Sequence, residues 1–273
     1  MRKIKAEKIA KAVTELVRQS SFFLRGDVLS ALRRSYSSEK NPRAKKMLKA
    51  ILDNASSARR KKLAICQDTG LPVVFMQIGQ GVAVTGDLRS AINKGVKDGY
   101  KKYYLRDSIV IDPLERGKPG FSSCVLHTDI VKGDKIKLTL LPKGFGCENK
   151  SQLKMFKPTA SIEEVKDFIV KVVKDAGPDA CPPYVVGVGI GGTADHAGVM
   201  AKKALLRKIS SGKSELERDL LKRINKIGIG PMGLGGENTA LAVHIQTYPT
   251  HIAGLPVSVN ISCHALRSAS VTL

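Results

Sequence analysis

Residues 63–72 read LAICQDTGLP, a short apolar run that ends at a cysteine and continues into an amide, a carboxylate and a Gly-Leu-Pro turn. The apolar residues predict a buried strand that presents Cys66, Gln67 and Asp68 at its carboxyl end. Aspartate is rarely buried unless it is paired or bound. The stretch is therefore either a functional group of polar side chains or a small buried cysteine beside a turn-forming aspartate.

Helices and strands are predicted on both sides of this stretch. Apolar spacing and capping signals predict helices over 4–18, 26–36, 42–54, 87–104 and 161–175. Apolar or alternating runs predict strands over 73–78, 124–131, 135–141, 184–190, 239–247 and 255–262. The sequence Lys132-Gly133-Asp134 favours a hairpin of strands 124–131 and 135–141. We expect an α+β fold, with mixed β-sheets surrounded by helices, as a single compact domain over residues 1–273.

The composition is that of a strongly basic globular protein. Its formal charge is +22, from 46 Lys and Arg against 24 Asp and Glu, so its field attracts anions. Aromatic residues make up only 5% of the chain and tryptophan is absent, whereas nucleic-acid-binding modules usually add stacking aromatics. A solvated basic surface is the favoured interpretation, and a nucleic-acid-binding protein without enzymatic activity is the alternative of another class.

Cellular context follows from apolar run length and from the cysteines. The sequence has no apolar run of membrane-spanning length and no signal-peptide core. Five widely spaced cysteines argue against a disulfide scaffold and favour a reducing compartment. We expect a cytoplasmic protein that does not associate with membranes.

The glycine-rich stretch 187–192 suggests a different function, the binding of a dinucleotide. It reads GVGIGG, which satisfies the dinucleotide-binding pattern G-x-G-x-x-G before a predicted helix. That pattern also requires a second strand ending in Asp or Glu about 20 residues later. The following region, 202–226, is instead predicted to be helical and is highly charged. The sequence therefore lacks the second strand that a dinucleotide-binding motif requires.

Two further features could bind an anion. The loop KGFGCENK at 143–150 follows a predicted strand, and glycines there let backbone amides approach a carboxylate. Arg106 follows a predicted helix and could hold a carboxylate through two parallel hydrogen bonds. A plain glycine turn and a surface arginine are the alternatives.

Three cysteines, Cys66, Cys181 and Cys263, each lie at a predicted strand boundary beside turn residues. They are too far apart in the chain for a zinc ribbon. Three thiolates brought together by the fold would suit a cubane iron-sulfur cluster whose fourth iron keeps an open position. Three separately buried cysteines are the alternative.

Five motifs in order along the chain resemble the alpha subunit of the class I fumarase and L-tartrate dehydratase family. They are Cys-Gln-Asp-Thr-Gly at 66–70, Leu-Arg-Asp-Ser at 105–108, Lys-Gly-Phe-Gly-Cys-Glu-Asn-Lys at 143–150, Cys-Pro-Pro at 181–183, and Thr-His-Ile-Ala-Gly-Leu-Pro-Val at 250–257 with Cys263. The resemblance implies an oxygen-sensitive hydro-lyase with a 4Fe-4S cluster ligated by Cys66, Cys181 and Cys263. The unligated iron would act as a Lewis acid on the hydroxyl and one carboxylate of the substrate.

The resemblance also implies roles for side chains around that cluster. Gln67, Arg106, Gly146 and His251 match positions that hold the dicarboxylate substrate. Asp68 matches a position beside the catalytic base, so Asp68 and His251 are the expected catalytic residues. A dianionic substrate is well served by such cations and backbone donors.

A partner chain is expected for the same reason. Single-chain members of the family continue beyond the position of Leu273 into a second domain that carries a threonine base. We expect a beta subunit to supply these groups in a hetero-oligomer. The expected reaction is reversible hydration of fumarate to L-malate, with dehydration of L(+)-tartrate as the alternative.

The sequence departs from the family pattern at one residue and in one segment. Cys147 stands where serine is common. Residues 116–123 do not match the Asn-Thr-Pro segment expected there.

Overall fold

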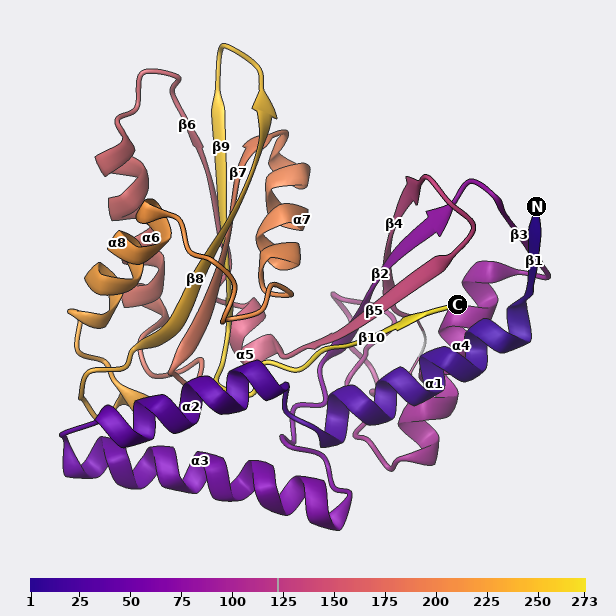
Figure 1. Ribbon diagram of the computed structural model, residues 1–273, viewed down its shortest axis with the longest axis horizontal. Helices are drawn as coiled ribbons and strands as arrows, with labels where there is room; N and C mark the ends of the chain where they lie inside the picture. The colour runs from indigo at the N-terminus through magenta and orange to yellow at the C-terminus, as the bar shows by residue number, and fades with distance from the viewer. Residues whose placement is uncertain (122) are drawn as a thin grey trace. The chain divides into compact units, whose positions relative to one another are not determined.

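A computed structural model describes residues 1–121 and 123–273, so Ser122 in the divergent segment 116–123 lies outside the described residues (Figure 1). The chain forms two compact units. The first unit comprises residues 1–25, 55–145 and 267–273, and the second comprises 26–54 and 146–266. Both units contain a mixed β-sheet with helices packed on it, which confirms the expected α+β class. The extent of the domain, 1–273, stays a prediction.

The first unit holds a two-stranded parallel sheet, β1-β3, and a four-stranded mixed sheet in the order β10-β5-β2-β4. Its elements are β1 (Arg2–Lys5), α1 (Ala6–Phe22), β2 (Leu71–Gly79), β3 (Val82–Thr85), α4 (Leu88–Lys102), β4 (Val125–Val131), β5 (Ile136–Lys143) and β10 (Ala269–Thr272). The strands β1, β3 and β10 were not predicted.

Helices α1 and α4 pack closely on each other. Gly95 of α4 allows this approach, because a Cβ atom there would lie 2.4 Å from the carbonyl oxygen of Ala10. Val13 and Leu16 of α1 and Ile92 of α4 are almost completely buried in the same core. The apolar spacing that predicted both helices therefore marks their buried faces.

The predicted hairpin of 124–131 and 135–141 is wrong, although both strands exist. Strand β2 lies between them, parallel to β4 and antiparallel to β5. The end of β2 takes the backbone bonds that a hairpin would have used, since Gly79 N donates to Lys135 O and Gln80 N donates to Val131 O. A Cβ atom at Gly79 would lie 2.4 Å from the carbonyl oxygen of Gly133, so glycine permits this approach.

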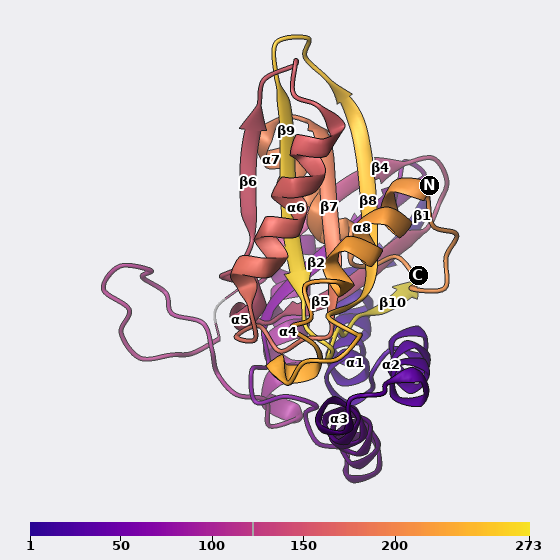
Figure 2. The same ribbon diagram turned by 90° about the vertical axis from the view of Figure 1, so that its left-hand side faces the viewer.

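The second unit is built on the sheet β6-β9-β7-β8. Its elements are α2 (Gly26–Ser38), most of α3 (Pro42–Lys61), most of α5 (Phe145–Glu148), β6 (Gln152–Phe156), α6 (Ile162–Ala176), β7 (Tyr184–Gly192), α7 (Ala194–Ala204), α8 (Glu215–Asn225), a 3-10 helix (Pro231–Gly233), β8 (Ala240–Thr250) and β9 (Leu255–Ser262). Helices α6 and α8 cover one face of this sheet and α7 covers the other (Figure 2).

Two glycines of the motif at 187–192 allow helix α7 to pack closely on strand β7. A Cβ atom at Gly187 or Gly189 would lie 2.1 Å from the carbonyl oxygen of Ala201 or Ala197, both in α7. The missing side chains let α7 lie directly on β7. Helix packing therefore accounts for the first two glycines of a pattern that resembles a nucleotide-binding motif.

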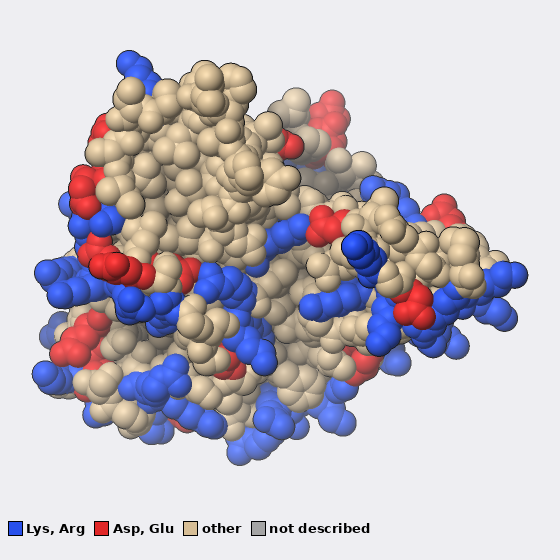
Figure 3. Space-filling model, turned by 45° about the horizontal axis from the view of Figure 1, so that its top comes forward, with Lys and Arg blue, Asp and Glu red and all other residues tan. Residues whose placement is uncertain are grey.

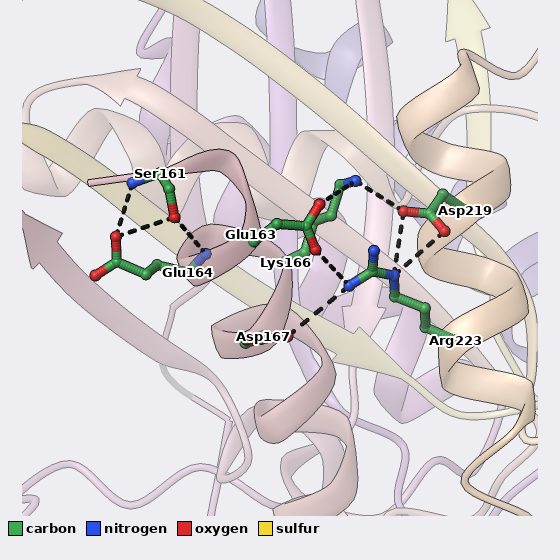
Figure 4. Close-up of polar contacts among 7 residues, drawn as sticks. All are labelled: Ser161, Glu163, Glu164, Lys166, Asp167, Asp219 and Arg223. Atoms are coloured by element: carbon green, nitrogen blue, oxygen red, sulfur yellow. Dashed lines mark hydrogen bonds and ion pairs between the residues drawn. The ribbon is translucent and has the colours of Figure 1, made fainter. Parts of the chain in front are cut away.

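Helices α6 and α8 are joined by a network of ion pairs (Figure 4). Lys166 bridges Glu163 and Asp219, each at 2.9 Å, while Arg223 lies 2.8 Å from Glu163 and 3.2 Å from Asp219. Ser161 and Glu164 form the predicted capping box at the start of α6. Because several charges share partners across the two helices, the network links α6 to α8.

Candidate functional site

The predicted strand over the first residues of the stretch 63–72 is wrong, because the chain is irregular until β2 begins at Leu71. Leu63 is 57% exposed. Its amide continues the end of α3 by donating to Ala58 O, and the amide of Ile65 donates to Ser21 O of α1. These bonds divert the backbone from a sheet. Cys66, Gln67 and Asp68 therefore lie in a turn, the 66–70 turn, that leads into β2.

The carboxylate of Asp68 is held between two backbone amides. Its Oδ1 accepts from Gly70 N at 3.0 Å and its Oδ2 accepts from Phe145 N at 2.8 Å. Gly70 has a φ of +80°, which favours glycine, and a Cβ atom at Gly144 would lie 3.0 Å from Oδ2. The loop at 143–150 thus gives its first helical amide to Asp68. This fixes the direction of the carboxylate.

The main chain of the 66–70 turn is also fixed. The Tyr100 hydroxyl lies 2.9 Å from Thr69 O and 3.0 Å from Gly70 O and donates to them. Burial raises the pKa of Tyr100, so this hydroxyl remains a proton donor at neutral pH. Thr69 Oγ1 in turn donates to Arg106 O at 2.8 Å. The first unit therefore brings the backbone of Arg106 to the turn, while the Arg106 side chain is exposed.

Arg267 is a member of this site that the sequence did not indicate. Its side chain is buried, and its Nη2 donates to Asp68 O at 2.8 Å. Arg267 directly follows the second unit in the chain. A lone arginine near the carboxyl terminus carries no sequence signal of burial, so only the tertiary structure identifies it.

The five cysteines, all thiols, fall into two classes. Cys124 and Cys147 are buried, and their Sγ atoms donate to Asn93 Oδ1 and to Ala180 O, each at 3.3 Å. Burial raises the pKa of Cys124 to about 11. Cys66, Cys181 and Cys263 are all partly exposed. These three are the ones predicted to ligate a cluster, and partial exposure suits a thiol that must lose its proton to bind metal.

Cys181 and Cys263 meet at one end of the sheet of the second unit. Cys181 has a φ of +58° shortly before β7, and Cys263 directly follows β9, where Ser262 pairs with Val185. His264 links them, because its backbone N lies 3.3 Å and its Nδ1 lies 3.1 Å from Cys181 O. The imidazole Nδ1 carries the proton for this bond, since a carbonyl can only accept.

Gly146 lies at the same end of the second unit. A Cβ atom there would lie 4.0 Å from Asp179 O, two residues before Cys181. The next residue, Cys147, donates to Ala180 O. Gly146, Cys181 and Cys263 therefore form one group in the second unit, and Cys66, Gln67, Asp68 and Arg106 belong to the first.

His251 lies at the other end of that sheet. It follows β8, whose Thr250 is opposite Gly192 at the carboxyl end of β7 (Figure 2). Strand β7 has nine residues, a length of roughly 26 Å at about 3.3 Å per residue. The imidazole is exposed, and its Nδ1 accepts from Ala253 N, which leaves Nε2 as the proton donor. The second unit does not bring His251 to Cys181 and Cys263.

Within the described ranges 1–121 and 123–273, no three His, Cys, Asp or Glu side chains are gathered in a metal-binding geometry. The same ranges contain no helix long and apolar enough to span a bilayer. On the face drawn in Figure 3, Lys and Arg side chains are spread among Asp and Glu, beside a broad uncharged area.

Comparison with known proteins identifies the family to which the chain belongs. The family model for fumarate hydratase (Fumerase) matches residues 10–272. The chain therefore belongs to the fumarate hydratase family, a family of hydro-lyases, as its motifs predicted. This membership favours an enzyme over the nucleic-acid-binding alternative.

Individual relatives carry a related name. A protein of Methanocaldococcus jannaschii, provisionally named L(+)-tartrate dehydratase subunit alpha, is 41% identical over 275 residues, which cover 96% of each chain. The L(+)-tartrate dehydratase subunit alpha of Escherichia coli strain UTI89 is 30% identical over 273 residues, which cover 97% of this chain and 90% of the relative. The similarity thus extends over nearly the whole of each protein.

Proposed function

We propose that this chain is the alpha subunit of a two-subunit iron-sulfur hydro-lyase that reversibly hydrates fumarate to L-malate. The observation that carries the proposal is the division of the cysteines into two classes. Cys66, Cys181 and Cys263 are partly exposed, while Cys124 and Cys147 are buried and donate hydrogen bonds. The chemistry of the first three thiols fits a 4Fe-4S cluster, and they are the proposed ligands.

When bound, the cluster would supply an open iron that acts as a Lewis acid toward the substrate's hydroxyl and one carboxylate. The protein's part is to place polar groups around the substrate. Gln67 and Arg106 are the proposed contacts from the first unit, and the backbone of Gly146 is the proposed contact from the second. The exposed Arg106 guanidinium can donate two parallel hydrogen bonds to a carboxylate.

Asp68 is the proposed participant in proton transfer. Both of its oxygens accept hydrogen bonds from amides, so the carboxylate keeps one orientation beside Cys66 and Gln67. A fixed carboxylate can position the group that moves the proton without reorganisation. The base itself is proposed to lie on the beta subunit.

His251 lies far from Cys181 and Cys263 along the sheet of the second unit. It lies about 26 Å along β7 from the end that carries Cys181 and Cys263. A His251 that donates through Nε2 to the same substrate would therefore come from a second copy of the chain. We propose this role for His251 in a hetero-oligomer with at least two alpha subunits.

Dehydration of L(+)-tartrate is the second candidate reaction. The relatives at 41% and 30% identity are both named as alpha subunits of L(+)-tartrate dehydratase. Tartrate and malate differ by one hydroxyl group, which a few polar contacts can discriminate. The subunit names also support a separate beta chain. Thiol ligands and an oxygen-sensitive cluster suit the reducing cytoplasm.

The proposal is tested by producing the chain together with a beta-type chain under anaerobic conditions and assaying fumarate, malate and both tartrate enantiomers. Turnover of fumarate and malate supports the first reaction, and turnover of L(+)-tartrate alone supports the second. The purified alpha chain without its partner should be inactive with every substrate. Activity of the single chain would contradict the two-subunit assignment.

A further inference from the structure

Arg267 is a buried cation of the first unit. Its side chain is only 4% exposed. No carboxylate forms an ion pair with it within residues 1–121 and 123–273, in contrast to Arg18 of the same unit, which pairs with Glu15. Burying an unpaired guanidinium is costly, so a protein that needed only packing would place an apolar residue there.

Among the described residues, Arg267 donates a hydrogen bond from only one of its three side-chain nitrogens. Nη2 donates to Asp68 O, whereas Nε and Nη1 are buried and have no acceptor in the part of the chain that the structure describes. Buried polar groups are nearly always hydrogen-bonded, so two such donors on one side chain indicate an acceptor that binds there. The positive charge indicates that this acceptor is anionic.

The chain around Arg267 limits what the anion can be. The carboxylate of Asp68 is not this acceptor in the described residues, because its oxygens accept from Gly70 N and Phe145 N and only the backbone oxygen of Asp68 accepts from Arg267. Arg267 donates a hydrogen bond to the turn that carries Cys66, and in the sequence it comes shortly after Cys263. Both cysteines are proposed cluster ligands. A cubane cluster held by three thiolates is anionic and has sulfur acceptors.

We propose that Arg267 is a positioning residue that also supplies the counter-charge of the cluster: it fixes the 66–70 turn through Asp68 O and presents Nε–H and Nη1–H to the thiolate and sulfide anions. This inference rests on the proposed function. Net charge and hydrogen bonds to sulfur set the reduction potential of such clusters. Arg267 therefore raises the potential, because a nearby cation stabilises the reduced, more negative state.

The test compares Arg267→Met and Arg267→Lys with a matched control, Arg18→Met, in the full-length chain. The cluster is assembled anaerobically with iron and sulfide, iron content is measured, and the midpoint potential is determined by a redox titration followed by electron paramagnetic resonance. Arg267→Met should shift the midpoint to a more negative potential. Arg267→Lys should lie between Arg267→Met and the wild type, and Arg18→Met should match the wild type.

The cluster-free chain gives a second measurement. If Arg267 is held for its charge, Arg267→Met should unfold at the same temperature as the wild type or higher, because removal of the unpaired buried cation offsets the loss of its hydrogen bond to Asp68 O. A purely structural arginine predicts the reverse: a lower unfolding temperature for the cluster-free variant and an unchanged cluster potential, and that result overturns the inference. A wild-type chain that assembles no cluster would overturn the proposed function as well, so the two failures are distinguishable.

Discussion

The backbone carbonyl oxygen of Asp68 accepts a 2.8 Å hydrogen bond from Nη2 of Arg267, which lies 199 residues further along the chain. The next two carbonyls of the turn, those of Thr69 and Gly70, accept from the Tyr100 hydroxyl. Three consecutive carbonyls are thus held by two buried side chains. The conformation of the 66–70 turn therefore depends on residues that are distant in sequence.

Tyr100→Phe should destabilise the fold of the first unit. The substitution removes the donor to Thr69 O and Gly70 O and leaves both carbonyls without it, which costs about 1–3 kcal/mol. Unfolding in urea, followed by circular dichroism, measures the loss. Tyr103→Phe is the control, since the Tyr103 ring packs edge-on against Phe22 and no hydrogen bond of its hydroxyl is found among the described residues. Equal stability of the two variants would show that the turn does not need Tyr100.

Asp68→Asn should reduce turnover without removing the cluster. Its amide NH2 group would face either Gly70 N or Phe145 N, so one of the two bonds is lost and the side chain rotates. We expect kcat to fall by roughly 10²-fold or more, the scale of acid-base contributions. Iron content and kcat are measured on the complex with the beta chain. Asp98→Asn, at an exposed position paired with Lys94, should leave both unchanged. Full activity of Asp68→Asn would remove Asp68 from the mechanism.

Alkylation should separate the two classes of cysteine. Burial raises the pKa of Cys124 to about 11, so at pH 8 only about one thiol in a thousand is the reactive thiolate. Brief treatment of the native, cluster-free chain with iodoacetamide, followed by mass spectrometry of its peptides, should label Cys66, Cys181 and Cys263 well before Cys124 and Cys147. Unfolding the chain first should make all five react. Preferential labelling of Cys124 in the native chain would contradict the division.

Glu217 should make stability sensitive to acid. Burial alone would raise its pKa, but hydrogen bonds from the amides of Ile245 and Ser214 and from Arg207 lower it below the unfolded value of 4.5. The stabilisation is therefore present above pH 4.5 and is lost as pH falls through the lower, folded pKa. Glu217→Gln should lose about 1–3 kcal/mol at pH 7. Its deficit relative to the wild type should shrink below pH 4.5 in denaturation experiments, and a deficit that does not change with pH would contradict this account.

The helices and most strands could be predicted from the sequence, because local spacing and caps specify them. Helix α4 begins after Asp87, which caps Ser90 N, and α6 has its predicted capping box. The run at 73–78 became β2. Strand order could not be predicted in the same way: the connection at Lys132-Gly133-Asp134 resembles a hairpin turn, and only the tertiary structure shows that β2 separates the two strands.

The family was predictable from the sequence, whereas the geometry of the candidate site was not. The motifs correctly identified the family, and the structure assigns the three expected ligand cysteines to the partly exposed class. The strand expected before Cys66 is wrong, since α1 and α3 take the backbone bonds of Leu63 and Ile65. Arg267, Tyr100 and His264 gave no sequence signal, because each acts on a backbone carbonyl far away in the chain.

The central claim, that Cys66, Cys181 and Cys263 hold a 4Fe-4S cluster, is tested most directly by anaerobic reconstitution of single Cys→Ser variants with quantification of iron, sulfide and visible absorption. The wild type, Cys124→Ser and Cys147→Ser should each bind about four irons per chain and turn brown. Cys66→Ser, Cys181→Ser and Cys263→Ser should form no stable cluster. A wild-type chain that stays colourless, or a Cys263→Ser variant with unchanged cluster absorption, would contradict the assignment.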